Sequence, residues 1–384
     1  MTFTYFGKIF LAVFGWILVS TQSNLSVSES RTPEASTAVA GDTSLKNLFK
    51  KDFLIGAALN TAQILEQDQA ENNLLNKHFN AITPENVMKS ALIHPAPGVY
   101  DFTVPDKMIA LGKKNGHYIV GHTLVWHSQL TPFAASMKNK DSLLAFLEEH
   151  ISTVAGRYKD DINSWDVVNE AFEENGEYRK SVFYNLLGES YIKTAFDLAK
   201  KASPKSKLYY NDYNIEQPQK RAGVVAMIKK LQASGTKIDG VGIQGHWSVN
   251  NLPLKEIEES IIEYSKLGLE VSFTELDLTV LPNPWDLRGA DVSSNYENSP
   301  KMNPYPDFLP DSMQLKLAKA YEDLFKIFLK HNDKIERITF WGLNDKQSWL
   351  NGWPIRGRTN YPLLFDRNNK SKLAFTKVAS LKKC

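Results

Sequence analysis

Short apolar segments alternate with longer amphipathic ones along most of the chain. Runs of this length, bounded by polar residues, are typical of buried β-strands. The pattern predicts eight strands, at residues 53–58, 79–83, 118–123, 164–169, 207–211, 241–244, 270–274 and 337–341.

Between these strands, apolar residues recur every three or four positions, which is the period of an amphipathic helix. Leu143, Leu147 and Ile151 lie on one such face. We expect Ser142 to cap this helix at its N-terminus, and Gly235 to end a later one. Further apolar faces comprise Val224, Ile228 and Leu231; Leu254, Ile257, Ile261 and Tyr264; and Leu317, Tyr321, Leu324 and Phe328.

Eight strands with helices between them predict a single (β/α)8 TIM barrel, of the α/β class, over residues 42–384. The alternative is an open, doubly wound sheet. Residues 55–60, at the end of the first strand, lack the glycine pattern of a dinucleotide-binding turn, which favours the barrel. No second domain is indicated.

The N-terminus has the pattern of a secretory signal. Lys8 precedes an apolar run at residues 9–19, and small polar residues follow. The alternative interpretation is a membrane anchor, but this run is shorter than the roughly 20 residues that a membrane-spanning helix needs. We therefore expect residues 1–23 to be a signal peptide, with the cleavage site left open, and the protein to be periplasmic or secreted. Residues 24–41, rich in Ser, Thr and Ala, are predicted to be a disordered linker.

Composition narrows the class of protein. The 45 basic and 43 acidic residues give a net charge of +2, which offers no reason to expect a nucleic-acid partner. Cys384 is the single cysteine, so an internal disulfide and a cysteine-based metal site are excluded. The 8 Trp, 15 Tyr and 20 Phe residues fit a large core or a cleft with flat faces for sugars. We expect a monomer without cofactor, metal or stable membrane insertion after removal of the signal.

Two of the predicted strands deliver a carboxylate at the same end. Asn169 and Glu170 follow the fourth strand, and Glu275 follows the seventh. Either glutamate alone could be a solvent-exposed strand end. Together they predict paired acid/base and nucleophile chemistry, because all C-terminal strand ends of a barrel converge on one face.

The other strand ends add neutral amides, imidazoles and indoles, with Lys89 as their main cation. Such a set suits an uncharged polyol, whose hydroxyl groups form hydrogen bonds and whose ring faces stack on Trp. The carboxylates then indicate glycoside hydrolysis. A separation of about 5–5.5 Å would mean retention and about 6.5–9.5 Å inversion, and the sequence leaves both open.

These segments resemble glycoside hydrolase family 10, whose members are mainly endo-β-1,4-xylanases. The resemblance rests on residues 165–171 and 274–277. It extends through residues 85–89, 121–127, 211–214, 244–246, 341–342, 348–349 and 362–366, in the same order. It implies a retaining endo-β-1,4-xylanase that hydrolyses xylan through a covalent glycosyl-enzyme.

The resemblance also implies roles for individual residues. Glu170 would be the acid/base and Glu275 the nucleophile. Asn169 would contact the sugar 2-hydroxyl, and His246 would hold the nucleophile. The remaining substrate-binding residues would be Asn86, Lys89, His122, Trp126, Tyr213, Gln244, Trp341 and Trp349, of which the last two would exclude a C6 hydroxymethyl group.

One segment departs from this pattern. Residues 282–310 contain six prolines and follow the strand with Glu275, so we expect a long loop that shapes one end of the cleft. Three other functions stay open: a cellulase or mannanase with the same glutamate pair, a metal-dependent hydrolase using His122, His127 and His246, and a glycan-binding protein without catalysis.

Overall fold

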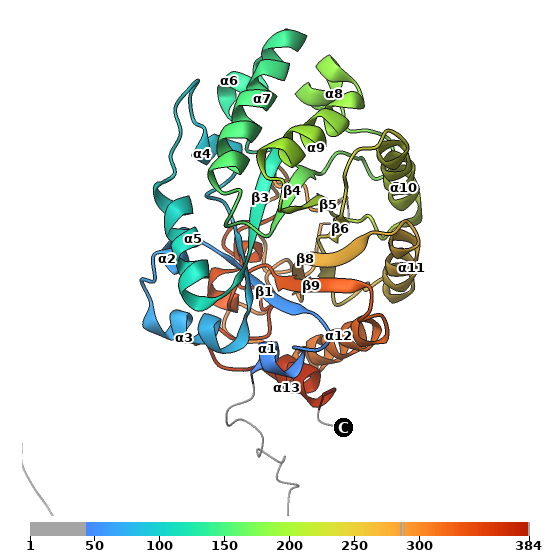
Figure 1. Cartoon of the computed structure of the whole chain (residues 1–384). Helices are drawn as coiled ribbons and strands as arrows, with labels where there is room; N and C mark the ends of the chain where they lie inside the picture. Colours follow the sequence, from blue (N-terminus) through green and yellow to red (C-terminus); the bar gives the residue numbers. More distant parts are fainter. Residues whose placement is uncertain (1–43, 285, 288, 383–384) are drawn as a thin grey trace, which may run out of the picture. The chain divides into compact units, whose positions relative to one another are not determined.

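The computed structural model describes residues 44–284, 286–287 and 289–382. Eight parallel strands form a closed barrel (Figure 1), because β6 pairs with β8 and β9 pairs with β1. The barrel strands are β1 (Leu54–Leu59), β2 (Ala81–Pro84), β3 (Tyr118–Trp126), β4 (Ser164–Asn169), β5 (Lys207–Asp212), β6 (Gly240–Ile243), β8 (Glu270–Thr279) and β9 (Ile335–Phe340).

All eight predicted strands are present, so the predicted TIM barrel is confirmed. Two extend at least three residues past the predicted ends: β3 continues to Trp126 and β8 to Thr279. A ninth strand, β7 (His246–Ser248), pairs in parallel with the end of β8 outside the barrel ring. The sequence did not predict β7, because three residues are too few for a period to be recognised.

Helices surround the barrel and provide the crossovers that parallel strands require (Figure 1). The longer ones are α3 (Gln69–His78), α5 (Thr103–Asn115), α7 (Lys140–Arg157), α9 (Ser190–Ala202), α10 (Pro218–Ala233), α11 (Leu254–Ser265), α12 (Asp311–Lys330) and α13 (Leu373–Ser380). Short helical segments are α1 (Leu45–Leu48), α2 (Thr61–Ile64), α4 (Ser90–Ile93), α6 (Pro132–Ala135), α8 (Val182–Leu187), η1 (Asp345–Gln347) and η2 (Trp349–Asn351).

The predicted cap of α7 is wrong. Asn139, not Ser142, precedes the helix, and its side chain accepts hydrogen bonds from the N–H groups of Asp141 and Ser142. Ser142 lies within the first turn. The prediction for α10 is confirmed, since Gly235 follows the C-cap with φ +74°, a conformation that glycine adopts without strain.

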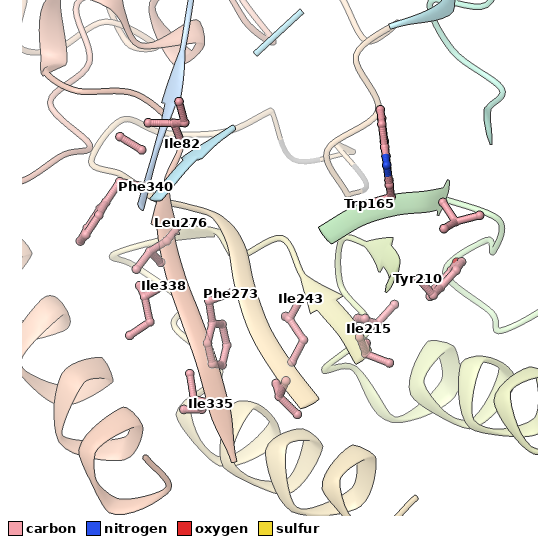
Figure 2. Packing of buried hydrophobic residues seen from close by; sticks show 14 of the residues in the cluster. Ile82, Trp165, Tyr210, Ile215, Ile243, Phe273, Leu276, Ile335, Ile338 and Phe340 are labelled. Carbon is pink, nitrogen blue, oxygen red and sulfur yellow. The ribbon is translucent and has the colours of Figure 1, made fainter. Parts of the chain in front are cut away.

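The apolar faces of the helices pack against the barrel strands in one core. Figure 2 shows Ile338 and Phe340 of β9 beside Phe273 and Leu276 of β8, their partners in register. Trp165 of β4 is fully buried, and it fits against β3 because residue 121 is glycine. A Cβ at Gly121 would lie 2.2 Å from the indole ring.

The predicted signal peptide and linker lie outside the described residues. Among the residues that the structure describes, no helix is both long enough and apolar enough to cross a bilayer.

Candidate active site

The two predicted carboxylates open onto the same cavity. Its volume is about 340 Å³, and both Glu170, directly after β4, and Glu275, within β8, line it. Each glutamate is only 5% exposed. The closed barrel thus brings together two residues that are far apart in the chain.

Two amide side chains link these carboxylates. Asn211 Nδ2 donates to Glu275 Oε1 at 2.8 Å and to Asn169 Oδ1 at 2.9 Å. Asn169 Nδ2 in turn donates to Glu170 Oε1 at 3.2 Å. Asn169 and Asn211 are in register on β4 and β5, so the barrel ladder itself sets this connection.

Glu170 has an unusual backbone conformation. Its φ of +56° lies in the left-handed region, which disfavours side chains and is found where surrounding contacts enforce it. Its N–H donates to the Asn211 carbonyl at 2.9 Å, and its own carbonyl accepts from Arg179 Nε at 3.1 Å. The turn aims the carboxyl group into the cavity, where Trp126 Nε1 donates to it at 2.7 Å and Gln244 Nε2 at 3.0 Å.

Burial raises the pKa of Glu170 to about 7, with the charge of Asp212 as the next contribution and that of Glu275 as a smaller one. The hydrogen bonds from Gln244 and Trp126 act in the opposite direction, because they favour the ionised form. Glu170 is therefore a carboxylic acid that can hold its proton close to neutral pH.

Glu275 has the opposite electrostatic environment. Burial would raise its pKa, but the hydrogen bond from His246 and the neighbouring imidazoles of His122 and His246 hold the pKa below the usual value. The Asn211 amide adds to this effect. Paired carboxyl groups whose pKa values are moved apart are suited to separate acid and nucleophile roles.

His246 joins Glu275 to a third carboxylate. Its Nε2 lies 3.3 Å from Glu275 Oε2, and its Nδ1 lies 3.0 Å from Asp277 Oδ1. Burial would lower the pKa of His246, but the charge and hydrogen bond of Asp277, followed by those of Glu275, raise it to about 10. The imidazolium then donates to both carboxylates. His246 thus contacts Glu275, and its role as the holder of the nucleophile stays a prediction.

The side of the cavity formed by β2 and β3 combines a cation with an indole. Lys89 is 6% exposed, donates to Asn86 Oδ1 at 3.0 Å and lies 4.9 Å from the ring centroid of Trp126. Burial lowers the pKa of Lys89. The negative charges of Glu275, Glu85 and Glu170 oppose this effect in part. His122 Nδ1 lies 3.0 Å from Asp166 Oδ2, which fixes its ring.

Indoles that follow β9 form another part of the cavity wall. Trp349 Nε1 donates to Asp277 Oδ2 at 2.8 Å, and its ring stacks on Trp353 with centroids 4.4 Å apart. Trp341 lies edge-on to His122, at 5.5 Å between centroids. These rings follow β9, where the sequence placed them.

The proline-rich loop closes one end of the cavity. Its lining residues are Ala290, Val292, Ser293, Ser294 and Asn295. The loop is attached to the segment after β9, because Trp353 Nε1 donates to the Asp291 carbonyl at 2.9 Å and Arg358 Nη1 to the Pro282 carbonyl at 2.9 Å.

Tyr213 differs from the other predicted site residues. The cavity, as the described residues form it, is lined by the other eleven and not by Tyr213. The Tyr213 hydroxyl accepts from Arg179 Nη2 at 2.7 Å, and Lys220 Nζ lies 3.7 Å from its ring centroid. Its contact with substrate stays a prediction.

Several contributors were not among the predicted site residues. Asn211 contacts Glu275 directly, and Asp277 contacts it through His246. Asp277 is two positions after Glu275 and so shares its face of β8. The further lining residues are Glu85, Gln129, Gly352, Trp353 and Arg356. In the ranges given above, no group of three or more His, Cys, Asp or Glu side chains is placed to hold a metal ion.

This chain is similar to known proteins over most of its length. The model of Glycosyl hydrolase family 10 matches residues 44–381. Endo-1,4-beta-xylanase A of Xylanibacter ruminicola is 41% identical over 342 residues, which cover 88% of this chain and 93% of the relative. Beta-1,4-xylanase of Dictyoglomus thermophilum is 42% identical over 337 residues, or 87% and 90% of the two chains. A solved GH10 endoxylanase from a sugarcane soil metagenome has a TM-score of 0.85 and 46% identity, covering 88% of this chain and 99% of that one.

Proposed function

Because this chain belongs to glycosyl hydrolase family 10, we propose that it is a retaining endo-β-1,4-xylanase that cleaves internal bonds of xylan. The observation that carries the proposal is the contrast between Glu170 and Glu275. One carboxyl group holds a proton near neutral pH and the other is kept ionised, and both face one cavity. The xylanase names of the relatives support xylan as the substrate.

In the first step, Glu275 attacks the anomeric carbon of the sugar bound at the cavity centre. The glycosidic C–O bond breaks, and the leaving oxygen takes the proton of Glu170. The product is an ester between the sugar and Glu275, with the shortened chain released. Asn169 would donate to the 2-hydroxyl, a contact that strengthens as positive charge develops on the ring.

In the second step, Glu170 works as a base. Once Glu275 is esterified, its negative charge is gone, and this removes one of the contributions that raise the pKa of Glu170. Glu170 then takes a proton from water while the water oxygen bonds to the anomeric carbon. The ester bond breaks, and Glu275 is restored as the carboxylate held by His246 and Asn211.

Xylose differs from glucose by the absence of the C6 hydroxymethyl group. We assign Trp341 and Trp349 to the wall that excludes this group, because both indoles line the cavity with the catalytic pair. Trp349 is held in place by its hydrogen bond to Asp277, so the wall is connected to the same strand as the nucleophile.

The decisive experiment compares hydrolysis of linear xylan, cellulose and mannan, and follows the anomeric configuration of the first products by NMR. We expect turnover of xylan with internal cleavage and β-configured products. Initial α products would overturn retention. Faster turnover of cellulose or mannan than of xylan would mean that the protein is a cellulase or a mannanase and not a xylanase.

We further propose export through residues 1–23, with residues 24–41 as a flexible linker to a single catalytic domain at 42–384. Support comes from the positive and apolar pattern of the N-terminus. Determining the N-terminus of the mature protein tests this. A mature chain that begins at Met1 would contradict it.

A further inference from the structure

A buried ion pair that takes no part in the two-step mechanism lies beside the acid/base turn. Asp212 is the last residue of β5, and Lys220 lies in the first turn of α10. Both are fully buried, with Lys220 Nζ 2.9 Å from Asp212 Oδ1. Desolvating two charges is costly, and replacing such a pair by apolar residues often leaves stability unchanged or higher.

The hydrogen-bond partners of Asp212 are those of a carboxylate. Within the described part of the chain it accepts three hydrogen bonds: from Lys220 Nζ, from the Tyr210 hydroxyl at 2.5 Å and from the Tyr213 N–H at 2.9 Å. Burial raises the pKa of Asp212 above its ordinary value, and the charge of Lys220 together with the hydrogen bonds from Tyr210 and Lys220 limits that rise. Every one of these partners is a donor, which is the arrangement of a carboxylate.

Tyr210 connects this carboxylate to the acid/base turn. Its hydroxyl donates to Asp212 Oδ2 and accepts the N–H of Ala171 at 3.0 Å. Because the hydroxyl proton is committed to Asp212, a lone pair of the oxygen faces Ala171. Ala171 directly follows Glu170, the residue with φ +56°.

Asp212 also contributes charge. The charged groups that act on Glu170 come from several elements: Asp212 from β5, Glu275 from β8, Lys89 from the segment after β2 and Arg179 from the segment before α8. Of the two carboxylates, Asp212 has the larger effect on Glu170, and it favours the protonated acid. Asp212 does not line the cavity formed by the described residues, so it acts through Glu170 and Tyr210.

We infer that Asp212, oriented by Lys220 and Tyr210, is a positioning residue that fixes the turn carrying Glu170 and keeps that residue protonated for the first step. The inference rests on the proposed function, since it concerns the same acid/base. A purely structural pair would hold β5 and α10 together without any selective effect on proton donation.

Two variants separate the charge of Asp212 from its hydrogen bond to Tyr210. Asp212→Asn keeps the size of the side chain and removes its charge. Tyr210→Phe keeps the charge and removes the hydroxyl that connects it to Ala171. Both are assayed for kcat/KM, across pH, on xylohexaose and on dinitrophenyl β-xylobioside, whose leaving group needs little protonation.

We expect Asp212→Asn to move the basic limb of the xylohexaose profile down by about 1 pH unit, because a like charge near Glu170 is lost. We expect Tyr210→Phe to lower kcat/KM for xylohexaose by about tenfold or more, since a displaced acid donates its proton less effectively. In both variants kcat/KM for the aryl substrate should change less than twofold (~0.4 kcal/mol).

Asp345→Asn provides the matched control. Asp345 is also fully buried, is paired with Lys372 at 2.8 Å and accepts from the N–H of Leu363 at 2.8 Å. This change should lower stability without moving the basic limb.

The inference is overturned if Asp212→Asn and Tyr210→Phe each lower kcat/KM equally on both substrates and the basic limb of the pH profile does not move. That result is expected of a purely structural ion pair. If Asp212→Asn does not fold, the substrate ratio of Tyr210→Phe decides alone. Failure of the proposed function would look different: the unmodified protein would not turn over xylohexaose.

Discussion

Trp126 donates its indole N–H to Glu170 Oε2 at 2.7 Å, and its backbone pairs in register with Asn169. The β3–β4 ladder therefore places the indole next to Glu170, the proposed acid/base. The hydrogen bond favours the carboxylate, whereas the burial that the same ring helps to provide favours the neutral acid. The pKa of about 7 is the balance of these two effects with the charges of Asp212 and Glu275 and the hydrogen bond from Gln244.

The pH dependence of the unmodified enzyme follows from the two pKa shifts. In the proposed mechanism, the free enzyme is active when Glu170 is protonated and Glu275 is ionised. kcat/KM should therefore fall as pH rises through about 7. On the acidic side it should fall only below the ordinary glutamate value of 4.5, because the pKa of Glu275 is lowered. Initial rates on xylohexaose at low substrate concentration test both limbs, and a basic limb near 4.5 would contradict the assignment.

Trp126→Phe keeps an apolar ring but removes the donor to Glu170. The pKa of Glu170 should rise, because the lost hydrogen bond stabilised its charged form. The basic limb of kcat/KM should then move to higher pH, even if substrate binding weakens and lowers the whole profile. A basic limb at lower pH would show that burial by the indole has a larger effect on the pKa of Glu170 than its hydrogen bond.

Glu170→Ala should distinguish substrates by their leaving groups. We expect kcat/KM on xylan to fall by about 10²–10⁴, the usual range for loss of a general acid, and kcat/KM on dinitrophenyl β-xylobioside to fall far less. Glu275→Ala is the control, because removal of the nucleophile should abolish turnover of both substrates. Equal losses on both substrates for Glu170→Ala would refute its role as the acid.

His246→Asn should affect the acidic limb. The imidazolium lowers the pKa of Glu275, so its loss should raise that pKa and move the acidic limb of kcat/KM to higher pH. The basic limb should stay close to 7, since His246 is not among the main groups acting on Glu170. An unchanged acidic limb would mean that His122 and Asn211 are enough to keep Glu275 ionised.

Gly121→Ala tests the packing of β3 on β4. The new Cβ would lie 2.2 Å from the Trp165 ring, so the indole or the strand must shift. We expect the free energy of unfolding in urea to fall by about 1–3 kcal/mol. Gly156→Ala, in α7, meets nothing within 4 Å and should instead stabilise by about 0.5–1 kcal/mol. Similar losses for both variants would contradict this explanation.

The barrel and most of the site could be predicted from sequence because one rule relates them. Each buried strand is a short apolar run, and a closed parallel barrel gathers the residues that follow each run on one face. Glu170 and Glu275 could therefore be paired without knowledge of any contact. The start of α7 was misplaced, since Asn139 and Ser142 are both good caps and only the backbone distinguishes them.

Tyr213 illustrates what strand ends alone do not reveal. It follows β5 as predicted, but its hydroxyl contacts Arg179, and its ring packs so closely on Gly289 that a Cβ there would lie 2.3 Å away. Both contacts join segments distant in the sequence. The proposed role of Asp212 likewise depends on a contact outside its own strand, with Lys220 in the helix that follows β5.

The attachment of the proline-rich loop to the segment after β9 has a consequence for engineering. Trp353 and Arg358 each donate to a backbone carbonyl of the loop, so the two segments form one joint. A chimera that takes only one of them from a relative would leave these donors facing a backbone of another shape. Exchange of substrate preference at this end of the barrel therefore requires transplanting both segments together.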